Sequence, residues 1–294
     1  MTVVSGGRTI FCEGKSDSLD YRLINKIVAD ISGDRCTIIP AGGKFTFSSF
    51  VQGYFSRNEM SNQRYIVFRD RDFDAIPTSD IQLLKLETRL GNNFTYLTYR
   101  SCIENYLLDA ELISSYWTEK YQEKVDNPSS KWGHGKPPDQ QTIWKWIETS
   151  ARTILSYQAV RWALSDLLRK SQAREQLKTT WTGSSGELPE SLALKQCQEQ
   201  AVNLINQFRQ ALESVTVEAF QTSLNSYQNQ FEQEDFWQNK QYLIWFHGKD
   251  IQKQMQRQEP NYISLRHFYN WAINQLDINQ HLELKELQTK IEQL

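Results

Sequence analysis

Residues 65–74 read YIVFRDRDFD, a short apolar run followed at once by alternating basic and acidic side chains. An uninterrupted apolar run of this length is typical of a strand that is buried on both faces. Such strands occur mainly in parallel sheets whose two faces are covered by helices. The stretch therefore predicts a strand over residues 65–68 of a parallel sheet, with Asp70 and Asp72 just beyond its C-terminal end.

Similar apolar runs recur on both sides of this stretch and alternate with helical patterns. Ser18 is a suitable N-cap for apolar residues at helical spacing, and Ser79 begins a pattern that Gly91 ends. Alternating strands and helices predict an α/β fold, with a mostly parallel sheet flanked by helices. The expected strands are residues 8–12, 36–39, 65–68 and 94–99, and the expected helices are residues 18–31, 45–55 and 79–90.

Beyond residue 110 the strand patterns stop, and helical patterns rich in Gln and Asn replace them. We therefore expect two domains, an α/β domain over residues 1–109 and a mainly α-helical domain over residues 110–294. The tryptophans of the helical half favour core or interface packing over base stacking. Residues 276–294 form an amphipathic pattern that either packs on the domain or meets a partner.

The chain of 294 residues carries 33 basic and 35 acidic side chains, a net charge of −2. This balance excludes a protein that works chiefly as a basic coat on nucleic acid or on an anionic membrane, but it leaves a local nucleic-acid site open. The four cysteines are far apart in the sequence, which indicates reduced thiols. With no signal-like N-terminus and no stretch apolar enough to span a bilayer, the sequence indicates a soluble cytoplasmic protein without a membrane partner.

Acidic residues follow three of the four predicted strands. The C-terminal ends of parallel strands meet at one edge of a sheet, where ligands bind. Carboxylates gathered there repel one another unless a cation lies among them, and their oxygen atoms suit Mg²⁺. Taken singly, each acid is better explained as a helix cap or a solvated turn, whereas the whole set favours a metal site. The acids are Glu13, Asp17, Asp70, Asp72 and Glu104.

The spacing of the two acids after the third predicted strand also favours a metal site. Side chains two residues apart on an extended strand point to the same side. If the strand continues past residue 69, Asp70 and Asp72 can therefore reach one metal ion.

Basic residues flank these acids. Arg69, Arg71 and Arg100 suit contacts with a nucleic-acid backbone, but salt bridges that balance the acids explain them equally well. Lys15 is open to the same two interpretations.

Residues 42–44 read Gly-Gly-Lys but do not form a P-loop. Ile38 and Phe45 occupy the positions of its first glycine and of its Ser or Thr. A tight turn that brings Lys44 near a phosphate and a plain structural turn both remain open. Any dependence on ATP would have to come from a partner.

Three features of the α/β half of the sequence resemble the TOPRIM domain of topoisomerases, primases and OLD-type nucleases. They are a strand followed by Glu13-Gly14-x-x-Asp17, a Gly-Gly turn after the second strand, and a strand followed by Asp70-x-Asp72. Residues 104–108 (ENYLL) are similar to a stretch of the nuclease branch, above all of the DUF4435 proteins, which include the nuclease subunit of the PARIS anti-phage defence system. The resemblance covers residues 9–109 and, beyond them, residues 247–250 (HGKD).

The sequence departs from this family pattern at two points. Topoisomerases and primases usually continue the third motif as DPDxxG, whereas Asp72 is followed here by Phe73-Asp74-Ala75, which favours a nuclease. Cys102 stands where some relatives carry a further acid, which favours a one-metal site over a two-metal site.

The resemblance implies a TOPRIM, Rossmann-like sheet and a nuclease that hydrolyses phosphodiester bonds of DNA or RNA with Mg²⁺ or Mn²⁺. Asp70 and Asp72 would be the main metal ligands, and Glu13 would be a ligand or general base. Asp17 and Glu104 would complete the shell of ligands.

The family pattern also implies partners and a catalytic residue in the C-terminal part of the sequence. Lys249, in the HGKD element, would neutralise charge in the transition state. The protein would act as a homodimeric toxic effector of anti-phage defence, controlled by a separate ABC- or AAA-type ATPase subunit.

Two other functions remain open. A non-catalytic adaptor would keep the TOPRIM shape for assembly of a complex, use the helical half as its working surface, and bind no divalent metal. A phosphoryl-transfer enzyme would act on free nucleotides rather than on polymers.

Overall fold

The computed structural model describes residues 7–29, 31, 36–43, 46–55, 65–86, 94–170, 193–213 and 215–294. The chain forms two compact units, Met1–Ile154 with Trp237–Leu294, and Leu155–Phe236. This division differs from the expected boundary after residue 109, because the helices on either side of the second unit pack together with the sheet.

The first unit is built on a five-stranded sheet of order β2-β1-β3-β5-β4. β2, β1, β3 and β5 are parallel to one another, and β4 pairs antiparallel with β5. The predicted α/β class with a mostly parallel sheet is therefore confirmed. The strands are β1 Thr9–Cys12, β2 Thr37–Pro40, β3 Tyr65–Arg69, β4 Leu84–Leu86 and β5 Phe94–Leu97.

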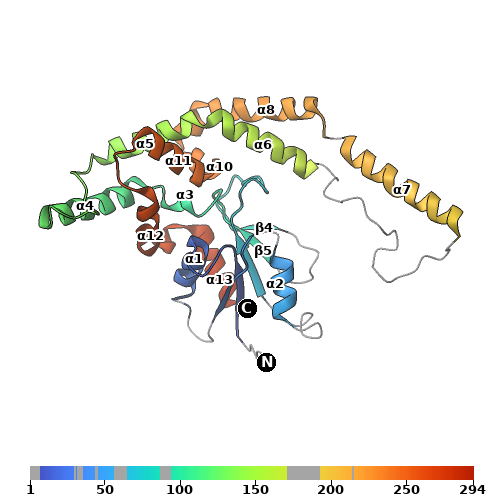
Figure 1. Cartoon of the computed structure of the whole chain (residues 1–294), viewed down its shortest axis with the longest axis horizontal. Coiled ribbons are helices and arrows are strands. Elements are labelled where there is room, and N and C mark those ends of the chain that lie inside the picture. The colour runs from blue at the N-terminus through green and yellow to red at the C-terminus, as the bar shows by residue number, and fades with distance from the viewer. Residues whose placement is uncertain are drawn as a thin grey trace. The chain divides into compact units, whose positions relative to one another are not determined.

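Helices cover both faces of the sheet, with α1 (Leu19–Ala29) and α2 (Phe47–Tyr54) on opposite sides (Figure 1). α2 buries its apolar side chains against Phe11, Tyr65 and Val67, which point to the same side of β1 and β3. The other face is covered by α1. Two covered faces explain why the strands are apolar without alternation.

One predicted helix is wrong. Residues 79–83 contain no helix and residues 84–86 form β4, while residues 87–90 lie outside the described part of the chain. Leu84 is buried, Lys85 is exposed and Leu86 is half-buried, so the apolar residues alternate with the period of a strand. Pairing with β5 satisfies the backbone of this segment and overrides its helical pattern.

The remaining helices of the first unit follow the sheet in the sequence or return to it near the C-terminus. α13 packs against α1, where the Gln288 side chain donates a hydrogen bond to the Ile27 carbonyl oxygen at 2.9 Å. The amphipathic C-terminal segment therefore packs on its own unit. These helices are α3 Glu104–Leu107, α4 Ala110–Asp126, α5 Gln140–Thr153, α10 Tyr242–Trp245, α11 Gly248–Gln258, α12 Leu265–Gln275, the 3₁₀ turn η2 Ile278–Gln280, and α13 Leu282–Glu292.

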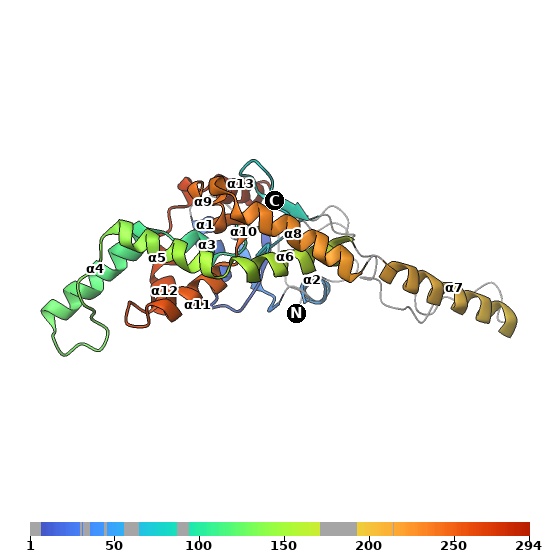
Figure 2. The same cartoon turned by 90° about the horizontal axis from the view of Figure 1, so that it is seen from above.

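The second unit is helical in its described part. It contains α6 (Leu155–Lys170), α7 (Leu194–Glu213) and α8 (Val217–Glu232), and α9 (Glu234–Gln238) joins it to the first unit. α6 and α8 lie side by side (Figures 1 and 2). Among the described helices of the whole chain, none has the length and apolar character needed to span a membrane.

Candidate metal centre

The topology has a switch point at the C-terminal ends of β1 and β3. These strands are neighbours, but the chain leaves β1 toward β2 on one side and leaves β3 toward β4, at the edge beyond β5, on the other. Ligands of open α/β sheets bind at such switch points. Glu13 directly follows β1, and Asp70 directly follows β3.

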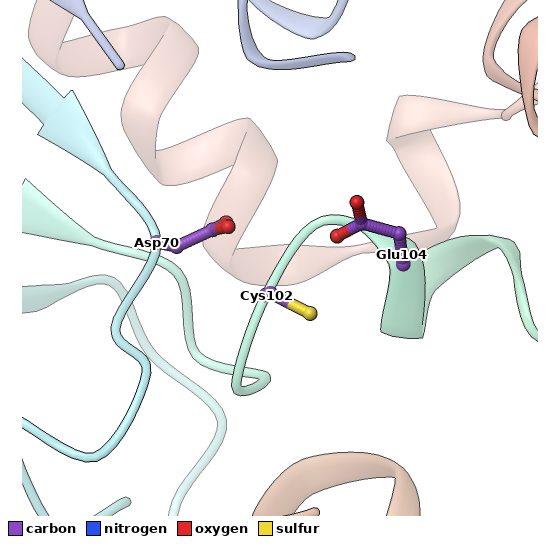
Figure 3. A group of neighbouring side chains, drawn as sticks. All are labelled: Asp70, Cys102 and Glu104. Carbon is purple, nitrogen blue, oxygen red and sulfur yellow. The ribbon is translucent and has the colours of Figure 1, made fainter. Parts of the chain in front are cut away.

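Asp70, Cys102 and Glu104 form a buried cluster in this region. One ligand atom from each, two carboxylate oxygens and the Cys102 Sγ, lies within 4.8 Å of the other two. Figure 3 shows the carboxylates of Asp70 and Glu104 pointing toward each other, with Cys102 on the turn between them. These three side chains could hold a metal ion.

Asp70 is held rigidly at the end of β3. Its Oδ1 accepts a hydrogen bond from the Ile103 N–H at 3.0 Å. Burial raises the pKa of Asp70 well above its ordinary value, and the charges of Asp20 and Glu104 raise it further. The charged form of this carboxylate is therefore unfavourable until positive charge compensates it.

The turn after β5 is fixed by the side chain of Asn105, which is fully buried. Its Oδ1 accepts hydrogen bonds from the N–H and the thiol of Cys102, both at 3.1 Å, and from the Gly248 N–H at 3.0 Å. Its Nδ2 donates to the Phe246 carbonyl oxygen at 2.9 Å. Asn105 thus joins the cluster to the segment that begins α11.

Lys249 reaches the cluster through this junction. Its Nζ lies 3.5 Å from Asp70 Oδ2 and 3.6 Å from Glu104 Oε1. Burial acts against the charged ammonium, but Asp70 and Glu104 outweigh it and raise the pKa of Lys249. The Gly-Lys element at residues 248–249 therefore folds back onto the acids, and these acids favour the charged form of Lys249.

Asp20, rather than Asp17, joins the acids near the cluster. Asp17 lies exposed on the turn before α1, whereas Asp20 is in the first turn of that helix, with its Oδ1 buried and without a hydrogen-bond partner among the described residues. Burial raises the pKa of Asp20 to about 7, with Lys249 opposing the shift and Glu104 and Glu13 adding to it. Asp17 therefore lies outside the buried group of acids, because α1 begins only after the turn.

Asp72 is outside the cluster of three. Its backbone is left-handed, with a φ of +50°, so the chain does not continue extended past β3 as the expectation required. Its Oδ1 lies 3.2 Å from His247 Nε2, and His247 stacks on the Phe73 ring. Asp72 therefore contacts the residue before Gly248 and does not lie beside Asp70 in one metal-binding group.

Two of the predicted nucleic-acid contacts are structural. Arg71 is completely buried and donates hydrogen bonds to the carbonyl oxygens of Tyr99, Ala75 and Ile244, at 3.1, 2.7 and 2.6 Å. Arg69 is buried in an ion pair with Asp74 at 2.8 Å. Neither guanidinium can reach a nucleic-acid backbone in this structure, since both compensate buried protein groups.

The other three residues predicted to contact nucleic acid differ in exposure. Arg100 is half-buried, donates to the Asn105 carbonyl oxygen at 2.7 Å and lies over the Tyr106 ring. Lys15 is exposed on the segment between β1 and α1, as a contact with a nucleic-acid backbone would require. Lys44 lies outside the described residues.

The donor set fits a divalent metal ion. Asp20 Oδ1 and Glu104 Oε2 are buried without hydrogen-bond partners among the described residues. Buried polar atoms are rarely left unpaired, so these oxygens are suited to a cation. The Tyr269 hydroxyl, on α12, is also buried and has no hydrogen-bond partner in the described part of the chain, and its pKa is raised by burial and by the charges of Glu104 and Cys102.

Sequence reasoning missed Asp20, Asn105 and Tyr269. Asp20 lies seven residues after Glu13 in the first helical turn, a position that is also ordinary for a helix-stabilising acid. Asn105 lies within the ENYLL stretch that resembles the nuclease branch, but nothing in that stretch marks its side chain as a positioning group, and Tyr269 carries no signal that distinguishes it from other polar residues of a helix. Comparison of the chain with protein-family models gives no match, and neither does comparison with curated proteins.

Proposed function

We propose that the protein is a divalent-metal-dependent nuclease that hydrolyses phosphodiester bonds of DNA or RNA. The observation that carries the proposal is the buried group of Asp70, Cys102 and Glu104 beside Lys249 at the C-terminal edge of a parallel sheet. Clustered acids beside a lysine match the needs of phosphoryl transfer, where charge on the attacked phosphate must be neutralised.

Asp70 and Glu104 would hold the metal ion, with Asp20 and Glu13 beside them. Mg²⁺ or Mn²⁺ bound there would neutralise the attacked phosphate and lower the pKa of a bound water. The unpaired oxygens of Asp20 and Glu104 support this assignment, because buried carboxylate oxygens without hydrogen-bond partners among the described residues are suited to a cation.

Lys249 would contact the phosphate. Its side chain is 46% exposed, although its ammonium is within ion-pair distance of two acids. A group held in this way can turn from the acids to a phosphate oxygen as charge develops there. Asn105 would act as a positioning residue, because it fixes both Cys102 and the start of α11.

We further propose the biological setting that the family resemblance implies. The protein would be a homodimeric toxic effector of anti-phage defence, restrained or triggered by a separate ATPase subunit. The failed P-loop pattern at residues 38–45 supports a separate source of ATP hydrolysis.

The decisive experiment is a cleavage assay on plasmid DNA, single-stranded DNA and tRNA with Mg²⁺ or Mn²⁺. Asp70→Asn and Glu104→Gln keep the size of each side chain and remove its charge, and we expect both to lower the rate at least about 100-fold. Glu111→Gln, in the exposed first turn of α4, is the matched control and should cut like the wild type. Equal cleavage by wild type and both cluster variants would refute the proposal.

One observation favours the non-catalytic adaptor as a second candidate. Lys249 already lies between Asp70 and Glu104, so the two acids are partly compensated by the protein itself. Isothermal titration calorimetry with Mn²⁺ separates the two functions. Binding that Glu104→Gln abolishes supports the nuclease, and absence of binding to the wild type supports the adaptor.

A further inference from the structure

A cavity of about 540 Å³ lies between the middle of α4, the loop that follows α4, and α12, all within the first unit. The loop, residues 127–139, leaves the free end of α4 and returns to α5 (Figure 2). The cavity is not part of the metal centre, and nothing in the proposed chemistry uses it. The side chains that matter most below are Tyr116, Lys120, Lys131, Trp132, His267 and Trp271.

Aromatic side chains form much of the wall. Trp132 is 65% exposed, an unusual state for the largest apolar side chain, and its ring meets the His267 ring at 5.3 Å in an edge-on arrangement. Tyr116 and Trp271 lie against each other at 5.4 Å on the opposing helices. An exposed indole beside further rings is suited to stacking on a flat ligand.

The charge of the wall is positive. Lys120, Lys131, His134 and His267 line the cavity, and no Asp or Glu of the described residues does. Lys120 is held by Glu123 at 2.9 Å, so its charge is already balanced. Lys131 is exposed and is adjacent to Trp132, which makes it the lysine best placed for an anionic group of a stacked ligand.

The loop that presents Trp132 is pre-formed. Ser130 Oγ accepts hydrogen bonds from the backbone N–H groups of Trp132 and Gly133, both at 3.1 Å. Gly133 packs so closely on α4 that a Cβ would lie 2.7 Å from the Lys124 Cα. Trp117 Nε1 donates to the Gly135 carbonyl oxygen at 2.8 Å. Ligand binding would therefore require little ordering of the loop.

α12 connects this cavity with the metal centre. Tyr269 is buried and lies close enough to Glu104 for the charge of that acid to raise its pKa. His267 and Trp271, two residues away on either side, line the cavity. α12 therefore packs against α3, the helix that begins with Glu104, and also lines the aromatic cavity.

We propose that the cavity binds an unpaired nucleobase of a single-stranded segment of the substrate, with the base stacked on Trp132 and a neighbouring phosphate next to Lys131. This inference rests on the proposed nuclease function and specifies its substrate class. A base must be unpaired to stack on an aromatic side chain of this cavity. DNA and RNA both offer the same base and phosphate chemistry. The near-neutral net charge of the protein is consistent with substrate binding that depends on base stacking.

The test measures binding without cleavage. The full chain is titrated in EDTA against short fluorescein-labelled single strands of DNA and of RNA, against a duplex, and against a single strand made of abasic sites. We expect Trp132→Ala to weaken binding of the base-bearing strands about tenfold. Trp132→Phe keeps a ring and should recover most of this loss, and Tyr121→Ala, an exposed ring of α4 that does not line the cavity, should change nothing.

The abasic strand separates stacking from charge. Trp132→Ala should leave its affinity unchanged, while Lys131→Ala should weaken both strands and lower the salt dependence by about one ion. Equal affinity of wild type and Trp132→Ala for base-bearing strands would overturn the proposal, and so would tighter binding of the duplex than of the single strands.

The same measurements distinguish this proposal from the nuclease itself. Trp132-dependent binding together with no metal-dependent cleavage would refute the nuclease and leave the base site standing. Cleavage that requires Asp70 and Glu104 but proceeds equally with Trp132→Ala, at substrate concentrations below saturation, would refute the base site and leave the nuclease standing.

Discussion

The Oδ1 atom of Asn105 accepts a hydrogen bond from the Gly248 N–H at 3.0 Å, although 143 residues separate the two in the chain. This contact brings α11 to the turn after β5, and with it Lys249 to Asp70. The site is therefore assembled from two distant segments, and its geometry depends on a junction that contains no charged group.

We expect Gly248→Ala to disrupt this junction. A Cβ at position 248 would lie 2.7 Å from Asn105 Oδ1 and 2.8 Å from the Asn105 backbone nitrogen, so the start of α11 would have to move. Displacement of Lys249 should lower cleavage at least about tenfold, since small misplacements of a catalytic group have large effects. Gly53→Ala is the control, because a Cβ there meets nothing within 4 Å. Cleavage and melting temperature of both variants decide the matter.

Lys249→Met should affect both activity and stability. Removal of the ammonium leaves Asp70 and Glu104 facing each other without compensation, so the metal-free protein should melt at a lower temperature than the wild type. Addition of Mn²⁺ should restore the melting temperature but not the cleavage rate. Lys253→Met, an exposed lysine of the same helix, should behave like the wild type in both measurements. A variant that melts lower and cuts normally would contradict the catalytic role of Lys249.

The strands and the first two helices were predictable, because a sheet with two covered faces needs uninterrupted apolar runs. β4 was not, because three residues at a sheet edge gain their stability from pairing rather than from their own pattern. The acids that end the strands were likewise predictable from topology, as Asp70 and Glu104 illustrate. Asp17 was predicted from its place after the first strand and from the family pattern, and Asp20 was overlooked because the sequence does not reveal how far the turn before α1 extends.

The metal-free protein should lose stability as the pH rises from 5 to 8. The pKa of Asp20 is raised to about 7 in the folded protein, above its value in the unfolded chain, so the folded state binds more protons in this window. The stabilisation is complete at low pH and is lost as the pH rises through about 7. Thermal melts in EDTA measure it.

Asp20→Asn provides the comparison. Its melting temperature should depend less on pH than that of the wild type, and Mn²⁺ should flatten the dependence of the wild type by compensating the ionised acids. A wild type whose stability relative to Asp20→Asn rises between pH 5 and 8 would contradict the placement of Asp20 among the acids.

Arg71→Met should destabilise the fold rather than weaken nucleic-acid binding directly. The substitution removes three hydrogen bonds to backbone carbonyl oxygens and leaves these acceptors buried. We expect a loss of about 3 kcal/mol, seen as a melting temperature lower by about 6 to 10 °C. Lys15→Met, at an exposed position, should leave the melting temperature unchanged. An unchanged melting temperature with reduced affinity for single strands would instead restore Arg71 as a binding residue.

Cys102 should give the site a preference among metal ions. Thiolate sulfur favours softer ions than Mg²⁺, whereas the carboxylates of Asp70 and Glu104 accept both kinds. Burial and these two acids raise the pKa of the Cys102 thiol, so the sulfur can coordinate only an ion able to displace its proton. We therefore expect Co²⁺ bound to the wild type to show a sulfur-to-cobalt charge-transfer absorption, and cleavage with Mn²⁺ to exceed that with Mg²⁺.

Two substitutions of Cys102 test its role in metal preference in opposite directions. Cys102→Ser should abolish the absorption, which the other three cysteines then cannot supply, since none of them lies in the cluster. Cys102→Asp replaces the sulfur by a carboxylate and should raise the ratio of Mg²⁺-supported to Mn²⁺-supported cleavage. An absorption that persists in Cys102→Ser would contradict this assignment, because Cys102 is the cysteine whose Sγ lies within 4.8 Å of a carboxylate oxygen of both Asp70 and Glu104.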